Sequence, residues 1–181
     1  MHASIADVIA DTAQNSIEAG AGHVSVTLTE RLGRISIEIC DNGKGMDEQT
    51  AAKAFDPFYT EPGKHDKRKV GLGLPILRQI CEATGGSVEL ESKKGVGTTL
   101  KYDFDASHID LPPMGDITVM VTALFNYPGD FELVFTHAKG DNRYSIAKSE
   151  LIDAVGPLDG IEALSLARDF ISSQESELSA S

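Results

Sequence analysis

An acid and an amide stand four residues apart in the segment DTAQNSIEAGA, which begins at Asp11. In a helix, Asp11 and Asn15 would project from adjacent turns of one face. The amide oxygen of Asn15 is a hard, weak ligand that suits magnesium, which keeps most of its waters and shares its shell with phosphates. The carboxylate of Asp11 could orient or deprotonate a water beside that metal. Taken alone, such a pair is more often two solvated helix positions.

A second carboxylate, Asp41, ends an apolar strand and opens the segment DNGKGM. A carboxylate there can select an amino group, such as N6 of adenine, because an unpaired buried acceptor is costly. Gly43 and Gly45 remove side chains where the chain must turn beside a flat ring. Asp-Asn-Gly is also a favoured β-turn, so this signal is weak by itself.

Two further glycine segments complete the set of motifs. GLGLP, residues 71–75, lies between a basic loop and a helix start, where backbone N–H groups and the helix dipole favour phosphate. In GVGTTL, residues 95–100, the hydroxyl of Thr98 could share a water with Asp41 and the base. The alternative is that these glycines only permit turns and the basic residues only keep the loop soluble. The loop residues that could reach a γ-phosphate are Lys64, Lys67, Arg68 and Lys69.

Hydrophobic periodicity predicts the elements that must hold these motifs. Apolar residues recur with helical spacing over 3–19, and apolar and polar residues alternate as in strands in four later segments. The order helix, hairpin, helix, loop, helix, hairpin predicts an α+β fold with one mostly antiparallel sheet and helices on one face. The predicted strands are 23–30, 33–41, 87–93 and 98–104, and the predicted later helices are about 47–54 and 75–83.

The charge is distributed unevenly along the chain. Residues 1–106 carry 16 acids and 12 bases, whereas residues 107–181 carry 12 acids and 4 bases. The change coincides with ASHIDLPPMGD, which is typical of a linker. We therefore predict a domain over 1–106, a linker over 107–115 and a small acidic α+β domain over 116–181.

The predicted acidic domain has its own order of elements. We expect a hairpin around Asn126–Asp130, a strand near Tyr144 and helices over about 147–154 and 159–175. The final residues, ESELSAS, should fray. In an alternative arrangement, the hairpin extends the first sheet and this part is an extension rather than a separate domain.

Composition excludes several classes of protein. No apolar run approaches the roughly 18 residues of a membrane helix, and the N-terminus lacks the pattern of a signal peptide. We therefore expect a cytoplasmic protein without membrane insertion. The net charge of −12 argues against binding to nucleic acid.

Cys40 and Cys81 are predicted to be free buried thiols rather than a disulfide or metal pair.

The succession of motifs resembles the GHKL superfamily, the ATP-binding domains of gyrases, Hsp90-type chaperones, mismatch-repair ATPases and sensor histidine kinases. The resemblance covers residues 3–106 and is strongest to the ATP-binding catalytic domain of sensor histidine kinases. It rests on an N box DTAQNSIEAGA, glycine boxes DNGKGM, GLGL and GVGTTL, and a phenylalanine box AFDPFYT at 54–60.

The resemblance implies a Bergerat-type α/β sandwich, with ATP and magnesium as ligands. It implies that Asn15 binds the metal and that Asp11 occupies the catalytic position, where hydrolysing members carry glutamate. The residues that it assigns to ATP are Asn15, Asp41, Gly43, Gly45, Met46, Phe55, Lys69, Gly71, Leu72, Gly73, Leu74 and Thr98.

Three functions fit these residues. The first is a histidine-kinase-like module without its own phosphoacceptor domain, which phosphorylates or regulates a separate protein; none of the five histidines heads an acceptor-helix pattern. The second is an ATP-hydrolysing switch of the mismatch-repair or gyrase type, with Asp11 as base. The third is a non-enzymatic ATP-sensing module that binds a partner. A homodimer is compatible with all three.

Overall fold

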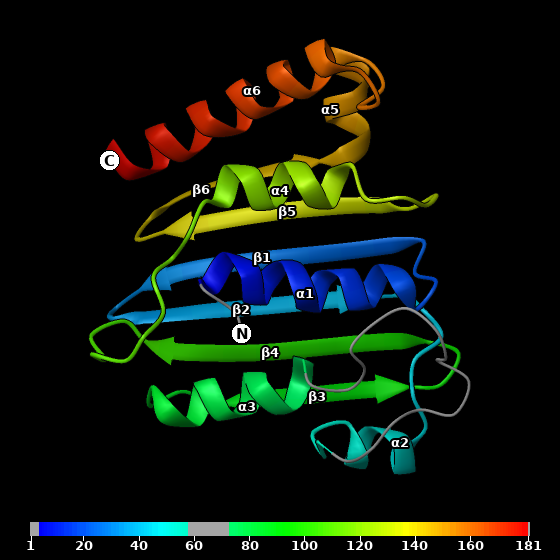
Figure 1. The fold of residues 1–181 in the computed structure, drawn as a ribbon, viewed down its shortest axis with the longest axis vertical. Helices are drawn as coiled ribbons and strands as arrows, with labels where there is room; N and C mark the ends of the chain where they lie inside the picture. The colour runs from blue at the N-terminus through cyan, green and yellow to red at the C-terminus, as the bar shows by residue number, and fades with distance from the viewer. Residues whose placement is uncertain (1–3, 58–72, 181) are drawn as a thin grey trace.

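The computed structural model describes residues 4–57 and 73–180. A six-stranded sheet forms its centre, in the order β3-β4-β2-β1-β5-β6, and the larger helices cross one face of it (Figure 1). The strands are β1 (His23–Arg31), β2 (Arg34–Asp41), β3 (Val88–Lys93), β4 (Gly97–Asp105), β5 (Glu132–Lys139) and β6 (Asn142–Ala147). The helices are α1 (Ile5–Glu18), α2 (Glu48–Lys53), α3 (Gly73–Ala83), α4 (Ile117–Phe125), α5 (Lys148–Val155) and α6 (Ile161–Ala180).

Helix α1 begins at a serine cap and buries one face against the sheet. The side chain of Ser4 accepts a hydrogen bond from the backbone N–H of Asp7 at 3.2 Å, which satisfies one of the free donors of the first turn. Farther along, Thr12 Oγ1 and the hydroxyl of Tyr102 lie 3.1 Å apart in the core. The helix predicted over 3–19 is therefore confirmed, and a buried polar contact ties it to β4.

The sheet confirms the predicted α+β class. Strands β1, β2, β4 and β3 are joined by antiparallel pairs, and their inward residues alternate with outward ones. The inner face packs against the helices, and the outer face carries mostly polar side chains, as an antiparallel sheet with one solvated face allows.

In the described part of the chain, no helix combines the length and apolar character that a membrane crossing requires.

The later part of the chain continues the same sheet. Strand β5 pairs with β1 in parallel, with Phe135 opposite Val26, and β6 pairs antiparallel with β5. The hairpin of residues 116–181 therefore extends the first sheet, which is the second of the two arrangements considered above. The boundaries of the predicted domains themselves stay a prediction.

The hairpin expected around residues 126–130 is wrong. Residues 117–125 form α4 instead of a strand, and the hairpin lies between β5 and β6. The carboxylate of Asp116 accepts a hydrogen bond from the backbone N–H of Val119 at 2.9 Å and so caps the helix. The sequence ITVMVTALF is rich in β-branched residues, which favour strands, but its buried positions recur with helical spacing. Those positions include Ile117, Met120, Val121, Leu124 and Phe125.

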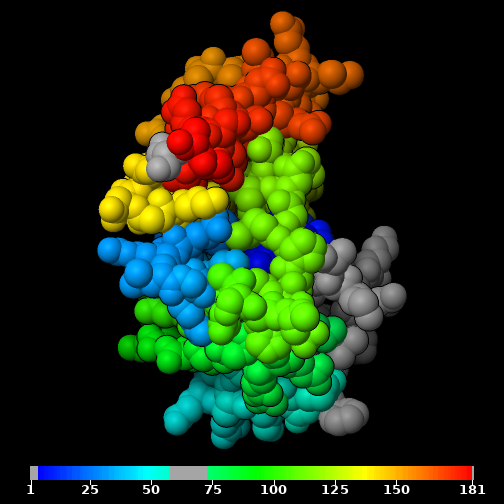
Figure 2. Space-filling view, turned by 90° about the vertical axis from the view of Figure 1, so that its left-hand side faces the viewer, coloured from blue at the N-terminus to red at the C-terminus, as the bar shows by residue number. Residues whose placement is uncertain are grey.

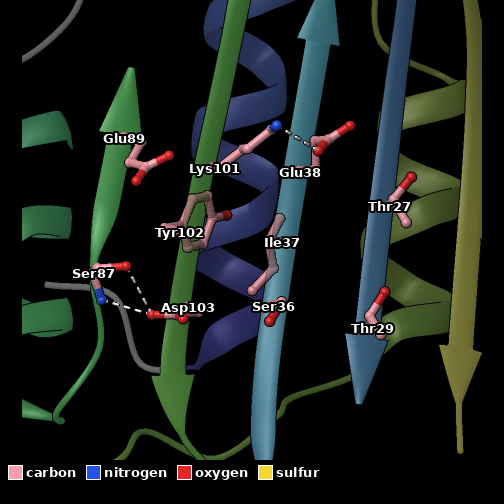
Figure 3. Close-up of a pocket in the computed structure, with 10 residues that line it drawn as sticks. All are labelled: Thr27, Thr29, Ser36, Ile37, Glu38, Ser87, Glu89, Lys101, Tyr102 and Asp103. Atoms are coloured by element: carbon pink, nitrogen blue, oxygen red, sulfur yellow. Dashed lines mark hydrogen bonds and ion pairs between the residues drawn. The ribbon is translucent and has the colours of Figure 1, made fainter. Parts of the chain in front are cut away.

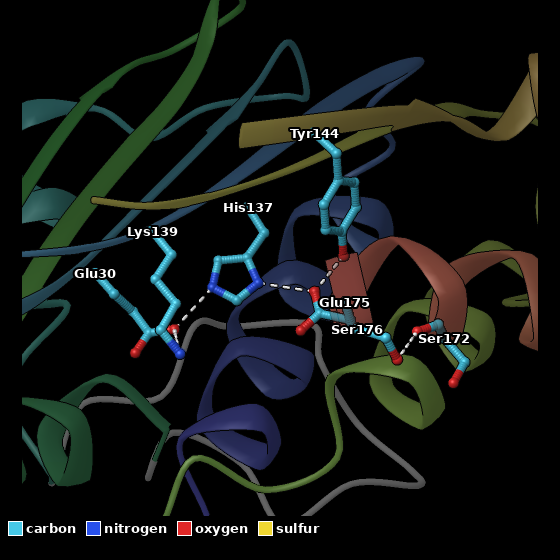
Figure 4. Close-up of polar contacts among 7 residues, drawn as sticks. All are labelled: Glu30, His137, Lys139, Tyr144, Ser172, Glu175 and Ser176. Carbon is cyan, nitrogen blue, oxygen red and sulfur yellow. Dashed lines mark hydrogen bonds and ion pairs between the residues drawn. The ribbon is translucent and has the colours of Figure 1, made fainter. Parts of the chain in front are cut away.

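The C-terminal segment does not fray as predicted, because α6 continues to Ala180. Nδ1 of the buried His137 lies 2.7 Å from Glu175 Oε1, and Nε2 lies 3.0 Å from Glu30 Oε1. The hydroxyl of Tyr144 also donates to Glu175 (Figure 4). These contacts fasten α6 to β1, β5 and β6, and Figure 2 shows its red end packed beside the yellow residues of the β5–β6 hairpin.

The two cysteines differ in their surroundings. Both are free thiols, but only Cys81 is buried, whereas Cys40 is half-buried. Burial raises the pKa of the Cys81 thiol to about 12. The prediction of free thiols is confirmed, and the prediction that both are buried is wrong for Cys40. The reason is the alternation of β2, in which Cys40 follows the inward-facing Ile39 and points to the other face.

Candidate functional site

The side chains of Asp11 and Asn15 lie beside the start of α3. A Cβ atom added to Gly73 would stand 2.8 Å from Asp11 Oδ2 and 3.7 Å from Asn15 Nδ2. The absence of a side chain at Gly73 therefore lets the first turn of α3 approach both polar groups. Asp11 is half-buried and Asn15 is exposed.

Both carboxylate oxygens of Asp41 are held by hydrogen bonds at the end of β2. Ser16 Oγ donates to Asp41 Oδ2 at 2.7 Å, and the backbone N–H of Gly43 donates to Oδ1 at 2.9 Å. These bonds fix the orientation of the carboxylate and leave its remaining lone pairs for a further donor. Ser16 was not predicted as a site residue; the available signal was a polar residue within the buried face of α1.

Thr98 lies directly opposite Asp41 on the neighbouring strand β4. Directly paired residues of adjacent strands point to the same face of the sheet. The hydroxyl of Thr98 lies 2.8 Å from Ser92 Oγ, and Ser92 Oγ also accepts a hydrogen bond from the backbone N–H of Met46 at 2.8 Å. The ends of β3 and β4 and the loop that follows β2 are therefore connected through small polar groups beside Asp41.

The glycines of DNGKGM are needed for close approach within the protein. A Cβ atom on the buried Gly43 would stand 3.0 Å from the carbonyl oxygen of Ala19, at the end of α1. Gly45 has φ +59°, and its Cβ atom would stand only 2.0 Å from the carbonyl oxygen of Lys93. Gly45 is therefore required by packing against the β3–β4 turn, whatever it contacts in a ligand.

A hollow of about 780 Å³ lies beside α2. The carboxylate of Asp47 accepts a hydrogen bond from the backbone N–H of Thr50 at 2.8 Å, which caps α2 and lowers the pKa of Asp47. The ring of Phe55 lies beneath the guanidinium of Arg78 from α3, at 5.7 Å from its centroid. The hollow is lined by Met46, Asp47, Glu48, Ala51, Ala52, Phe55 and residues 90–94.

The remaining predicted residues divide into two groups. Leu74 is partly buried and packs against the core. Lys69, Gly71 and Leu72 lie outside the described residues, as do Lys64, Lys67, Arg68 and the end of the phenylalanine box.

Within residues 4–57 and 73–180, no group of three or more histidine, cysteine, aspartate or glutamate side chains could hold a metal.

A second hollow, of about 360 Å³, lies on the outer face of the sheet (Figure 3). Two pairs of its polar groups contact each other: Lys101 Nζ lies 3.4 Å from Glu38 Oε2, and Asp103 accepts a hydrogen bond from the backbone N–H of Ser87 at 2.6 Å. None of the predicted site residues lines it. The candidate site is therefore on the helix-covered side, where α1, α3 and the ends of β2 and β4 meet.

Comparisons with known proteins show what the chain is similar to. A family described as "Histidine kinase-, DNA gyrase B-, and HSP90-like ATPase" matches residues 2–112. "Heme sensor protein HssS" of Staphylococcus saprophyticus is 35% identical over 104 residues, which cover 58% of this chain and 22% of that protein. "Sensor histidine kinase YvrG" of Bacillus subtilis is 32% identical over 82 residues, which cover 45% of this chain and 14% of that protein.

The chain thus spans less than a quarter of the length of these two curated relatives. Among solved structures, the N-terminal domain of a DNA repair protein matches with a TM-score of 0.54 and 16% identity. That match covers 80% of this chain and 51% of the other chain. At this level of identity the likeness is one of fold.

Proposed function

Because this chain belongs to the family of histidine kinase-, DNA gyrase B- and HSP90-like ATPases, we propose that it binds ATP with magnesium and transfers the γ-phosphate to a separate protein. The observation that carries the proposal is the convergence of Asp11, Asn15 and Asp41 on one side of the sheet. Asp11 and Asn15 lie beside Gly73 of α3, and Asp41 is held at the adjacent strand end by Ser16.

The adenine would be selected at Asp41. Its carboxylate is an acceptor, and the amino group N6 of adenine is a donor, whereas guanine presents a carbonyl oxygen at the equivalent position. Thr98 stands opposite Asp41 and could hold a water between the base and the protein. The hollow lined by Met46 and Phe55 adjoins this strand end and offers apolar surface to the ring.

The phosphates would lie toward α3 and Asn15. The first backbone N–H groups of α3 and the positive end of its dipole favour anions. Asn15 would hold magnesium, since its amide oxygen is a hard ligand and Gly73 leaves room beside it. Bound magnesium would neutralise charge on the phosphates. Lys69 is our proposed contact for the γ-phosphate.

The proposed reaction is phosphoryl transfer from ATP to a histidine of a partner protein. This is supported by the similarity to a relative named a sensor histidine kinase. The protein would contribute position and fixed charge, because phosphoryl transfer requires little covalent chemistry from the enzyme. Asp11 would accept a hydrogen bond from the attacking group or hold its proton.

A radiolabel experiment tests the proposal. The protein is incubated with γ-labelled ATP, magnesium and candidate partner proteins, and the label is followed. We expect label on a partner, with no transfer by Asp41→Asn. The matched control is Asp141→Asn, in an exposed turn where the aspartate side chain is 97% exposed. Tight ATP binding without transfer to any partner would count against the kinase function.

Hydrolysis is a second candidate, favoured by the position of Asp11 beside the start of α3. In that case label would appear as free phosphate, and Asp11→Asn would abolish release without abolishing binding. If the label stays on bound ATP and partner affinity changes with nucleotide, the chain is an ATP-sensing module instead. The same experiment thus separates the three functions.

A further inference from the structure

Helix α1 is held at both ends by residues that follow β4 in the chain. At its start, the backbone N–H groups of Ile5 and Ala6 donate to the carbonyl oxygens of Pro113 and Met114 at 2.9 and 2.8 Å. At its other end, the hydroxyl of Tyr127 donates to Glu18 Oε1. The segment between β4 and β5 therefore spans the whole length of the helix that carries Asp11 and Asn15.

Tyr127 has a defined position at the end of α4. Its backbone N–H donates to the carbonyl oxygen of Leu124 at 3.2 Å, so it closes the last turn of that helix. Its ring is partly buried and packs against the hydrophobic core. Helix α4 contacts both α1 and α6, so α4 lies between α1 and α6.

The turn that contains Glu18 is in direct contact with the candidate site. The backbone N–H of Ala19 donates to the carbonyl oxygen of Asn15 at 3.0 Å. The carbonyl oxygen of Ala19 accepts a hydrogen bond from the backbone N–H of Lys44 at 3.1 Å. A displacement of this turn would therefore move both Asn15 and the DNGKGM loop that contains Gly43.

We propose that Tyr127 is a positioning residue for the nucleotide site, which acts through Glu18 and so couples residues 117–180 to ATP binding. The inference rests on the proposed function. The Tyr127–Glu18 hydrogen bond fixes the last turn of α1 against α4. When the turn is fixed, Asn15 and the DNGKGM loop keep the positions in which they would contact the phosphates and the base. A shift of α4 would loosen the turn and weaken binding.

The test compares Tyr127→Phe with Tyr144→Phe by calorimetric titration with magnesium and a non-hydrolysable ATP analogue. Both variants remove one hydroxyl that donates to a glutamate, but Tyr144 lies on β6 and contacts α6 rather than α1. We expect about threefold to tenfold weaker binding in Tyr127→Phe. We expect unchanged affinity in Tyr144→Phe, with its effect confined to the unfolding temperature.

A double-mutant cycle distinguishes positioning from general stability. Glu18→Ala should weaken binding by the same factor as Tyr127→Phe, and the double variant should be no weaker than either single one. Equal affinity of Tyr127→Phe and wild type would overturn the inference while leaving the proposed function intact. If Tyr127→Phe does not fold, Glu18→Ala decides: wild-type affinity there overturns the inference. Absence of nucleotide binding in the wild type would instead refute the proposed function.

Discussion

Ser16 Oγ donates a hydrogen bond of 2.7 Å to Asp41 Oδ2, which joins the last turn of α1 to the end of β2. Ser16 is the residue after Asn15, so one turn of α1 carries the proposed metal ligand and also orients the proposed adenine acceptor. This hydrogen bond therefore links the proposed phosphate half of the site to its proposed base half.

We predict that Ser16→Ala weakens ATP binding about tenfold, because the Asp41 carboxylate loses a donor that fixes its orientation. Selectivity for ATP over GTP should fall as well. Calorimetric titration with both nucleotides measures the two effects. Ser25→Ala, an exposed position on β1, is the matched control and should leave both values unchanged. Undiminished affinity in Ser16→Ala would show that Asp41 does not depend on this hydrogen bond.

Asn15→Ala should remove the magnesium dependence of nucleotide binding. The side chain is exposed, so the free energy of unfolding should change by no more than about 0.5 kcal/mol. ATP affinity is measured with magnesium and with a chelator, and in the variant we expect the two values to converge. Gln14→Ala, the neighbouring position on α1, should keep the difference. A full magnesium effect in Asn15→Ala would exclude this residue as the ligand.

Gly45 and Gly95 provide a matched pair for backbone strain. Both have positive φ, but a Cβ atom on Gly45 would meet the carbonyl oxygen of Lys93, whereas Gly95 has nothing within 4 Å. Gly95→Ala should cost about 1 kcal/mol, the usual penalty of a left-handed position. Gly45→Ala should cost about 3 kcal/mol or more, since the β3–β4 turn must also move. Chemical denaturation measures both, and equal losses would contradict the packing role of Gly45.

The sequence identifies the elements of residues 1–106 well because their buried positions have a clear period. The hairpin predicted around 126–130 requires a strand at 117–125. Ile, Thr and Val at the start of that segment favour a strand, although Asp116 supplies a helix cap. Burial against α1 and α6 decides such a segment, because the exposed Val119 and Ala123 are also apolar and obscure the helical period in the sequence. The site shows the same limit: the motif residues are visible in the sequence, whereas Ser16 becomes visible only when β2 is placed beside α1.

The end of α6 also differs from the prediction, for an electrostatic reason. ESELSAS looks like a polar tail, but Glu175 meets His137 and Tyr144 from two strands. A partly buried carboxylate is stabilised by such partners, and they lie 31 and 38 residues away in sequence. Local composition therefore could not have predicted that this segment is fixed.

The buried His137 makes the stability of the protein depend on pH. Burial opposes its protonation, but the hydrogen bonds with Glu175 and Glu30 outweigh that effect and raise the pKa of His137 above 6.5. The hydrogen bond from His137 in turn lowers the pKa of Glu30. The other groups that face this cluster are the Tyr144 hydroxyl and the ammonium of Lys139, which lies 4.0 Å from Glu30. Only the imidazolium can donate to both carboxylates.

Stabilisation by His137 is accordingly complete below pH 6.5 and is lost as the pH rises through the raised pKa of the folded protein. In that window the free energy of unfolding should fall by up to about 1.4 kcal/mol per pH unit, the limit for one proton. Denaturant unfolding between pH 6 and pH 9 measures the slope. His137→Gln should be less stable at pH 6 and should lose this slope, whereas His23→Gln, at the exposed start of β1, should retain it. An unchanged slope in His137→Gln would assign the pH dependence to another group.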